Sequence, residues 1–201
     1  MAERAETFDT DLVVHGAGRA PNLDALDLER ANVRFGKKGV EVNEFLQSTS
    51  NAAGDAAASP GWPLTPVTSL EGNVVAANLL QGNREKPDYT GMPSVVFTIP
   101  ELTRVGLLET EARERGLDVT CKFTDMGGWY SVERVGEIHA AAKVLVENGS
   151  GRIAGAHILG PEASELINIF GLAMRSGLPA SDLENLVSAY PSHGSDIGYL
   201  V

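Results

Sequence analysis

The sequence has only one cysteine, Cys121, and four histidines in 201 residues. A lone cysteine cannot form a disulfide within the chain, and this chain by itself therefore carries no dithiol redox chemistry. The histidines and the cysteine are scattered and show none of the spacings typical of zinc ligands. No metal site is predicted.

Long apolar runs and an excess of basic residues are also missing. No apolar run approaches the roughly 18 residues of a membrane span, and the charged first residues lack the apolar core of a signal peptide. Sixteen Lys and Arg residues against 27 Asp and Glu residues give a net charge of −11, which argues against a phosphate-binding surface for nucleic acid. We expect a soluble, acidic, cytoplasmic protein with no nucleic-acid or membrane partner.

The composition is otherwise that of a globular protein, with 43% hydrophobic and 21% charged residues. A segment rich in Gly, Pro and charge, residues 81–93, is typical of a linker. It divides the chain into a first part, residues 1–91, and a second part, residues 92–201.

In the first part we expect short strands at Leu12–Val14 and Val40–Val42. Pro66 is expected to open a helix, because proline is favoured in the first helical turn and apolar residues follow at helical spacing.

The second part alternates predicted strands and helices. Asn148–Gly151 has the residues of a tight turn and predicts a hairpin between Lys143–Glu147 and Arg152–Leu159. Further strands are expected at Ser94–Thr98 and Leu117–Phe123, and helices at Thr110–Arg115, Pro161–Ser176 and from Ser181 to about Ser188. This order predicts an α+β fold, an antiparallel sheet with helices on one face.

Three segments of the first part have residues that suit a ligand. Gly16-Ala-Gly18 begins like a dinucleotide-binding motif, but Pro21 stands where the third glycine is needed, which favours a plain turn. At Asn51–Asp55, small residues would let a ligand approach Gly54, and Asp55 could accept a hydrogen bond from a sugar hydroxyl; an ordinary turn is the alternative. Leu64–Val67 would place helix N-terminal N–H groups near an electron-rich group.

In the second part, His139 and His157 lie on predicted strands, where a structural role is favoured. Tyr190–Asp196 is polar and places His193 three residues before Asp196. A solvated tail explains this segment equally well.

Taken in order, these segments resemble one family, the pyridine nucleotide–disulfide oxidoreductases, which includes glutathione reductase, dihydrolipoamide dehydrogenase and mercuric reductase. The resemblance covers nearly the whole chain. It rests on Asp11–Asn22, Ala53–Asp55, Leu64–Val67 with Glu71–Gly72, Ser94–Thr98 with Val105–Gly106, and the Tyr190–Pro191 segment.

The resemblance implies a partial FAD-domain segment followed by an interface, or dimerisation, domain. The FAD pyrophosphate motif, the redox-active cysteine pair and the NAD(P)H-binding domain would belong to a preceding part of a full-length enzyme. The resemblance assigns Asp55 to the hydroxyls of the flavin's ribityl chain, with Gly54 allowing close approach. It assigns Thr65, Pro66 and Val67, at the helix start, to the pyrimidine end of the flavin ring.

The sequence departs from the family pattern in two places. Tyr190-Pro191 stands where the family has a catalytic His-Pro pair, and Ser195 or Asp196 stands where it has the orienting glutamate. The segment before Asp55 is also several residues shorter than the family's.

Two hypotheses follow. The first is a C-terminal fragment of an FAD-dependent NAD(P)H oxidoreductase, inactive alone, that forms a homodimer through the Pro161–Ser176 helix and the C-terminal helix. The alternative is a stand-alone dimerisation or interaction module that binds no flavin.

Overall fold

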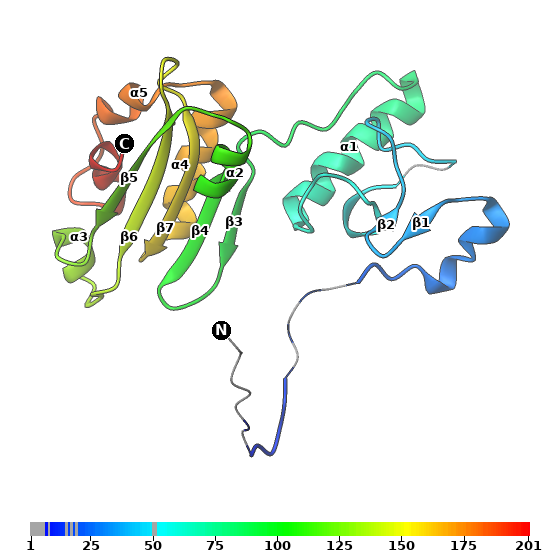
Figure 1. Cartoon of the computed structure of the whole chain (residues 1–201), viewed down its shortest axis with the longest axis horizontal. Coiled ribbons are helices and arrows are strands. Elements are labelled where there is room, and N and C mark those ends of the chain that lie inside the picture. Colours follow the sequence, from blue (N-terminus) through cyan, green and yellow to red (C-terminus); the bar gives the residue numbers. More distant parts are fainter. Residues whose placement is uncertain (1–6, 8, 15, 17, 19, 50–51) are drawn as a thin grey trace. The chain divides into compact units, whose positions relative to one another are not determined.

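The computed structural model describes residues 7, 9–14, 16, 18, 20–49 and 52–201. The chain divides into two compact units, one up to Pro87 and one from Asp88 to Val201 (Figure 1). This division lies four residues before the expected boundary. Each unit is described separately below.

The first unit is built from short elements around one long helix. Its elements are the 3-10 helices η1 (Asp24–Leu26), η2 (Leu28–Ala31) and η3 (Gly54–Ala56), the strands β1 (Phe35–Gly36) and β2 (Gly39–Val40), and the helix α1 (Thr65–Gln81). A small core joins Leu23, Val33 and Val40. Beyond the β1–β2 hairpin, Val40 also pairs with Ala57 in a parallel bridge, which ties the η3 loop to the unit.

The predicted strand at Leu12–Val14 is wrong. These side chains are at least 77% exposed, and no described strand pairs with the segment. A strand forms only where a neighbouring strand pairs with its backbone N–H and C=O groups. The strands β1 and β2 pair with each other and not with this apolar triplet.

The predicted helix at Pro66 is confirmed as α1, with the proline in its first turn. Its buried residues are Val67, Glu71, Val74 and Asn78, which recur every three or four positions along one face. Two of these four side chains are polar, and Glu71 carries the interactions described in the next subsection.

The second unit is a five-stranded antiparallel sheet with strand order β3-β4-β7-β6-β5. Its strands are β3 (Pro93–Val96), β4 (Glu101–Gly106), β5 (Val119–Asp125), β6 (Ala141–Glu147) and β7 (Ile153–Gly160). The predicted β6–β7 hairpin is confirmed. Strand β4 was not predicted. One of its two buried residues, Thr103, is polar, and its one exposed residue, Leu102, is apolar. The sequence of this strand therefore lacks the regular alternation of apolar and polar side chains.

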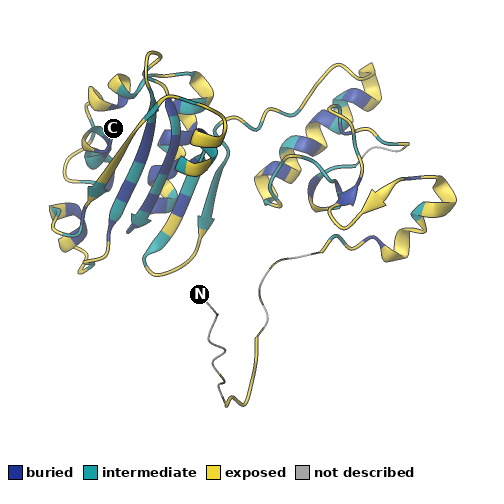
Figure 2. Cartoon of the chain, in the orientation of Figure 1, coloured by how far each residue is buried: buried dark blue, intermediate teal, exposed yellow. Residues whose placement is uncertain are grey.

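The helices of this unit are α2 (Glu109–Glu114), α3 (Tyr130–Glu133), α4 (Ala163–Ser176), α5 (Ala180–Glu184) and the 3-10 helix η4 (His193–Tyr199). Helix α4 covers one face of the sheet, packing on β3, β4 and β7 (Figure 1). The core lies between them, with Val105, Val144 and Ile158 from the strands and Ile167 and Phe170 from α4 (Figure 2). The α+β fold predicted from the sequence is confirmed.

Helix α4 is apolar around most of its circumference, but one stripe remains exposed. The exposed residues of the helix are Glu165, Asn168, Leu172, Arg175 and Ser176. The helix begins at Ala163, two residues after Pro161, since Glu162 adopts a left-handed backbone conformation with φ of 57°. It ends at Gly177, as expected.

The opposite face of the sheet carries a row of basic side chains. Arg104 on β4, His157 on β7 and Lys143 on β6 lie side by side in register. Two carboxylates from α2 reach this row, Glu111 to Arg104 at 3.3 Å and Glu109 to Lys143 at 3.0 Å. The expectation that His139 lies on a strand is wrong, because it lies in the loop before β6.

No described helix is both long enough and apolar enough to cross a lipid bilayer.

Candidate functional site

The loop that carries Gly54 and Asp55 is held against α1 by a buried carboxylate. Glu71, which is 0% exposed, accepts hydrogen bonds from the backbone N–H of Gly54 and from Oγ of Ser59, each at 2.5 Å. Its two oxygens therefore hold Gly54, at the start of η3, and Ser59, three residues after the end of η3, to one position on the helix.

Gly54 occupies a position that only glycine fits well. Its φ is +64°, and a Cβ atom there would lie 2.6 Å from Oγ1 of Thr68, in the first turns of α1. The absence of a side chain lets the loop backbone lie directly on the helix. Asp55, the next residue, is exposed.

The start of α1 lies beside this loop. Thr65 and Pro66 are exposed, and no described side chain caps the helix at Leu64. Val67 is 3% exposed, so its side chain belongs to the core and only its backbone can meet a ligand. The structure thus brings the predicted residues Gly54, Asp55, Thr65, Pro66 and Val67 into one region.

Asp55 also lines a cavity of about 280 Å³ with Lys37, Lys38 and Ser59. The two lysines come from the β1–β2 turn. A carboxylate and two ammonium groups at one cavity suit a ligand with both hydroxyl and electron-rich groups. In the predicted Gly16–Gly18 turn, the structure describes Gly16 and Gly18 but not Ala17. Asn51, the first residue of the Asn51–Asp55 segment, also lies outside the described residues.

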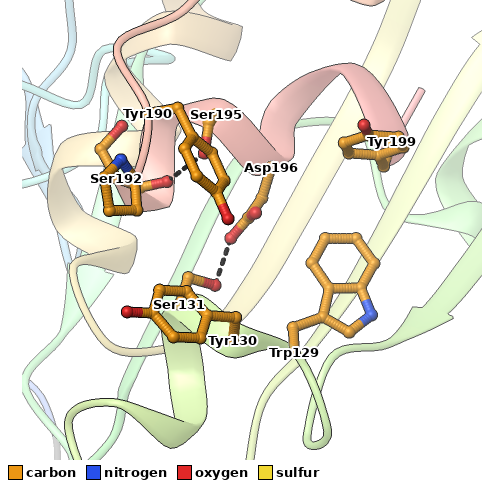
Figure 3. Close-up of a pocket in the computed structure, with 9 residues that line it drawn as sticks. Trp129, Tyr130, Ser131, Tyr190, Ser192, Ser195, Asp196 and Tyr199 are labelled. Atoms are coloured by element: carbon orange, nitrogen blue, oxygen red, sulfur yellow. Dashed lines mark hydrogen bonds between the residues drawn. The ribbon is translucent and has the colours of Figure 1, made fainter.

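The Tyr190–Asp196 segment forms a second region, in the other unit. Tyr190 and Pro191 line a cavity of about 300 Å³ together with Trp129, Tyr130, Tyr199 and Asp196 (Figure 3). Oγ of Ser131, on α3, donates a hydrogen bond to Oδ2 of Asp196. Asp196 is therefore held by a serine 65 residues earlier.

His193 lies apart from this cavity. It is 7% exposed and lines a different cavity with Ile169 and Leu172 of α4. Their spacing in the sequence suggested that His193 and Asp196 share a site. In the structure the two side chains line different cavities.

Several residues of these two regions were not predicted from the sequence. Glu71 belongs to the segments that carry the family resemblance, but no role was predicted for it; its place on the buried face of α1 with Val67 and Val74 was the signal. Trp129, Tyr130 and Tyr199 had none, since they are distant in the sequence and meet only after the sheet forms.

Three titratable groups in or beside the basic row of the sheet have shifted pKa values. Burial, reinforced by the neighbouring Arg104 and Lys143, lowers the pKa of His157 below its ordinary value. On the strand beside Lys143, partial burial and the nearby Glu109 raise the pKa of the Cys121 thiol. Hydrogen bonding to Lys143 holds the pKa of Glu109 low. The ion pairs of Glu109 with Lys143 and of Glu111 with Arg104 balance the charge on this face of the sheet, which is a structural arrangement.

Comparison with known proteins identifies the second unit. Residues 92–200 match the dimerisation domain of the pyridine nucleotide-disulphide oxidoreductases. An uncharacterized 19.7 kDa protein in a mercuric resistance operon of Staphylococcus aureus is 44% identical over 180 residues, which are 88% of this chain and all of that protein. Dihydrolipoyl dehydrogenase of Geobacillus stearothermophilus is 34% identical over 94% of this chain, which spans only 40% of that enzyme.

Among solved structures, the chain is similar to RclA of Escherichia coli, a flavoprotein disulfide reductase induced by HOCl. The two superimpose with a TM-score of 0.81 at 27% identity, over 92% of this chain and 43% of RclA. Both units of the present chain therefore correspond to part of a larger flavoprotein.

Proposed function

The chain belongs to the pyridine nucleotide-disulphide oxidoreductase family, and we propose that it contributes a homodimerisation domain and one wall of an FAD site to such an enzyme. It corresponds to the C-terminal part of these flavoproteins. The observation that carries the proposal is the attachment of the Gly54–Asp55 loop to α1 by Glu71. This attachment keeps two predicted flavin-contacting segments together in a unit that spans only part of the family's FAD domain.

The residues of this wall suit FAD. Asp55 would accept hydrogen bonds from ribityl hydroxyls, and the missing Cβ of Gly54 leaves the loop backbone close to the helix. The positive end of the α1 dipole, near Thr65, Pro66 and Val67, would stabilise electron density on the flavin ring. FAD, when bound, supplies the hydride and electron transfer of this family.

The redox cysteine pair and the NAD(P)H-binding segments expected of a complete enzyme are not predicted in this sequence. NAD(P)H would therefore be a partner of a full-length enzyme only, and we expect no reductase activity from the chain alone. Its place in the cytoplasm stays a prediction from the sequence.

A titration of FAD fluorescence with the purified chain tests the flavin wall. We expect saturable quenching that is weakened by Asp55→Asn and unchanged by Asp27→Asn, an exposed aspartate of the same unit. Absence of saturable quenching would reject the flavin wall and favour the dimerisation module without flavin.

Self-association is assigned to the second unit. The buried residues of α4 face the sheet, so its exposed stripe, with Leu172 62% exposed, is the part of this helix that can meet a second copy. Val187, after α5, is 96% exposed and offers a further apolar contact. Leu172→Glu should weaken the dimer, whereas Leu80→Glu, at an 85% exposed position of α1, should not.

A further inference from the structure

The turn between β6 and β7 contains the only asparagine of the sequence that is followed by glycine, Asn148. Both Asn148 and Gly149 are exposed. A Cβ atom at Gly149 would meet no atom within 4 Å, and no hydrogen bond from its backbone N–H occurs among the described residues. Because glycine has no side chain to shield its nitrogen, this nitrogen is open to reaction with the preceding side-chain amide.

The side chain of Asn148 is held from two directions by residues at the start of β5. Its Nδ2 donates a hydrogen bond to Oδ1 of Asp118 at 2.7 Å, and its Oδ1 accepts one from Oγ1 of Thr120 at 2.8 Å. The backbone N–H of Asn148 also donates to the carbonyl of Asp118 at 2.8 Å. A reaction between the amide carbon and the nitrogen of Gly149 requires the side chain to turn, and both side-chain hydrogen bonds oppose this rotation.

We propose that Asn148 is a site of spontaneous deamidation whose rate is set by Asp118 and Thr120. The backbone nitrogen of Gly149 loses its proton and bonds to Cγ of Asn148, while Nδ2 takes up a proton and leaves as ammonia. A succinimide ring results, and water opens it at one of its two carbonyl carbons. Breaking the bond from nitrogen to Cγ leaves aspartate, whereas breaking the bond to the backbone carbonyl leaves isoaspartate.

Either product disrupts the contact between the turn and β5. The amide that donates to Asp118 is replaced by a carboxylate, which can only accept, so two negative charges face each other. Isoaspartate also adds one carbon to the main chain of a tight turn. Since β5 is an edge strand that pairs only with β6, its start has no second strand to hold it. The modification therefore loosens one edge of the sheet and does so irreversibly.

Incubation of the purified chain at mildly alkaline pH tests the proposal. Isoaspartate is counted by enzymatic methylation with labelled S-adenosylmethionine, and mass spectrometry of proteolytic peptides locates it. We expect it to accumulate at Asn148. Asn185 is the internal control, because it is an equally exposed amide that donates to the carbonyl of Ser181 but is followed by Leu186, whose side chain hinders attack.

Variants test the control of the rate. Thr120→Val and Asp118→Ala should each speed deamidation about fivefold, the factor that corresponds to one ordinary hydrogen bond. Both positions are exposed, so the variants should fold, and Glu114→Ala, at another exposed position of this unit, should leave the rate unchanged. Equal rates in the unaltered chain and both variants would overturn the proposal, as would the absence of isoaspartate at Asn148 from all of them.

The effect on the sheet is measured separately with Asn148→Asp, which carries one of the two products from the start. Amide hydrogen exchange at Val119 and Thr120 should be about fivefold faster in this variant than in the unaltered chain near neutral pH. Asn185→Asp should leave exchange at these two residues unchanged. The same exchange rates in both variants would contradict the expected loosening of β5.

Discussion

The carboxylate of Glu71 accepts a hydrogen bond from the backbone N–H of Gly54 over 2.5 Å, across 17 residues of sequence. Glu71 is fully buried and also accepts from Ser59 at 2.5 Å. Since a buried carboxylate is stable only when donors compensate its lost hydration, loop and helix depend on each other. The geometry of the proposed flavin wall rests on this relationship.

Replacing Glu71 should therefore destabilise the first unit. Glu71→Ala leaves two buried donors without their acceptor and should cost about 3 kcal/mol, whereas Glu71→Gln keeps one acceptor oxygen and should cost about half. Urea unfolding followed by Trp62 fluorescence, with Trp129 replaced by Phe, measures this cost. Glu29→Ala, at an exposed glutamate of the same unit, is the control. Equal stability of the Glu71 and Glu29 variants would contradict the account.

Gly54 and Gly82 provide a matched pair for the close approach of the loop to α1. Both have positive φ, at 64° and 79°, but a Cβ would clash with Thr68 only at Gly54. Alanine at either position should cost about 1 kcal/mol in backbone strain, and Gly54→Ala should cost more and weaken FAD quenching. Adding Thr68→Ala should recover the excess cost in unfolding experiments. If Gly82→Ala is as harmful as Gly54→Ala, the close approach is not what matters.

The pH dependence of the second unit should reveal His157. Neither of its ring nitrogens has a hydrogen-bond partner among the described residues, and its pKa is lowered from 6.5 by burial and by the cations Arg104 and Lys143, against an opposing effect of Glu111. The folded state then binds fewer protons than the unfolded state, so stability falls as pH drops below about 6.5.

Thermal unfolding between pH 7.5 and 5 measures this loss. His157→Phe should flatten the profile, and His139→Phe, at a loop histidine, should not. The lowered carboxyl pKa values of Glu109 and Glu137 act below about 4.5, outside this range. An unchanged slope in His157→Phe would refute the assignment.

The thiol of Cys121 should react slowly with iodoacetamide. Its pKa is raised by partial burial and by Glu109, whose Oε2 lies 3.7 Å from the sulfur. Glu109→Gln should lower the pKa and speed alkylation at pH 8 about twofold, because the thiolate is the reactive form and Lys143 remains nearby. Glu111→Gln serves as the control. An alkylation rate that is the same in both variants would argue against the effect of Glu109.

The parts of the fold governed by local chemistry could be predicted from the sequence. The β6–β7 hairpin followed from Asn148–Gly151, where Gly149 and Gly151 adopt the positive φ that the turn needs. Helix α1 followed from Pro66 and the periodicity after it. Strand β4 could not be predicted, because Thr103 points inward through a hydrogen bond to the carbonyl of Ile158 that is only available once β7 is paired.

Of the two candidate sites, one could be predicted from the sequence and the other could not. The residues of the proposed flavin wall were predicted through the resemblance to a family, and the structure adds the contact of Glu71 that holds the Gly54 loop to α1. The aromatic cavity depends on residues from Trp129 to Tyr199, joined by no local pattern. Long-range packing, which the sequence does not display, creates it.

Sedimentation equilibrium of the whole chain tests the central claim, which is that the second unit is a working dimerisation domain. The account predicts a mass of twice the 21.3 kDa of one chain at micromolar concentration. It also predicts a shift toward the single-chain mass in Leu172→Glu but not in Leu80→Glu. A mass of one chain throughout the micromolar range, for the unaltered protein, would contradict it.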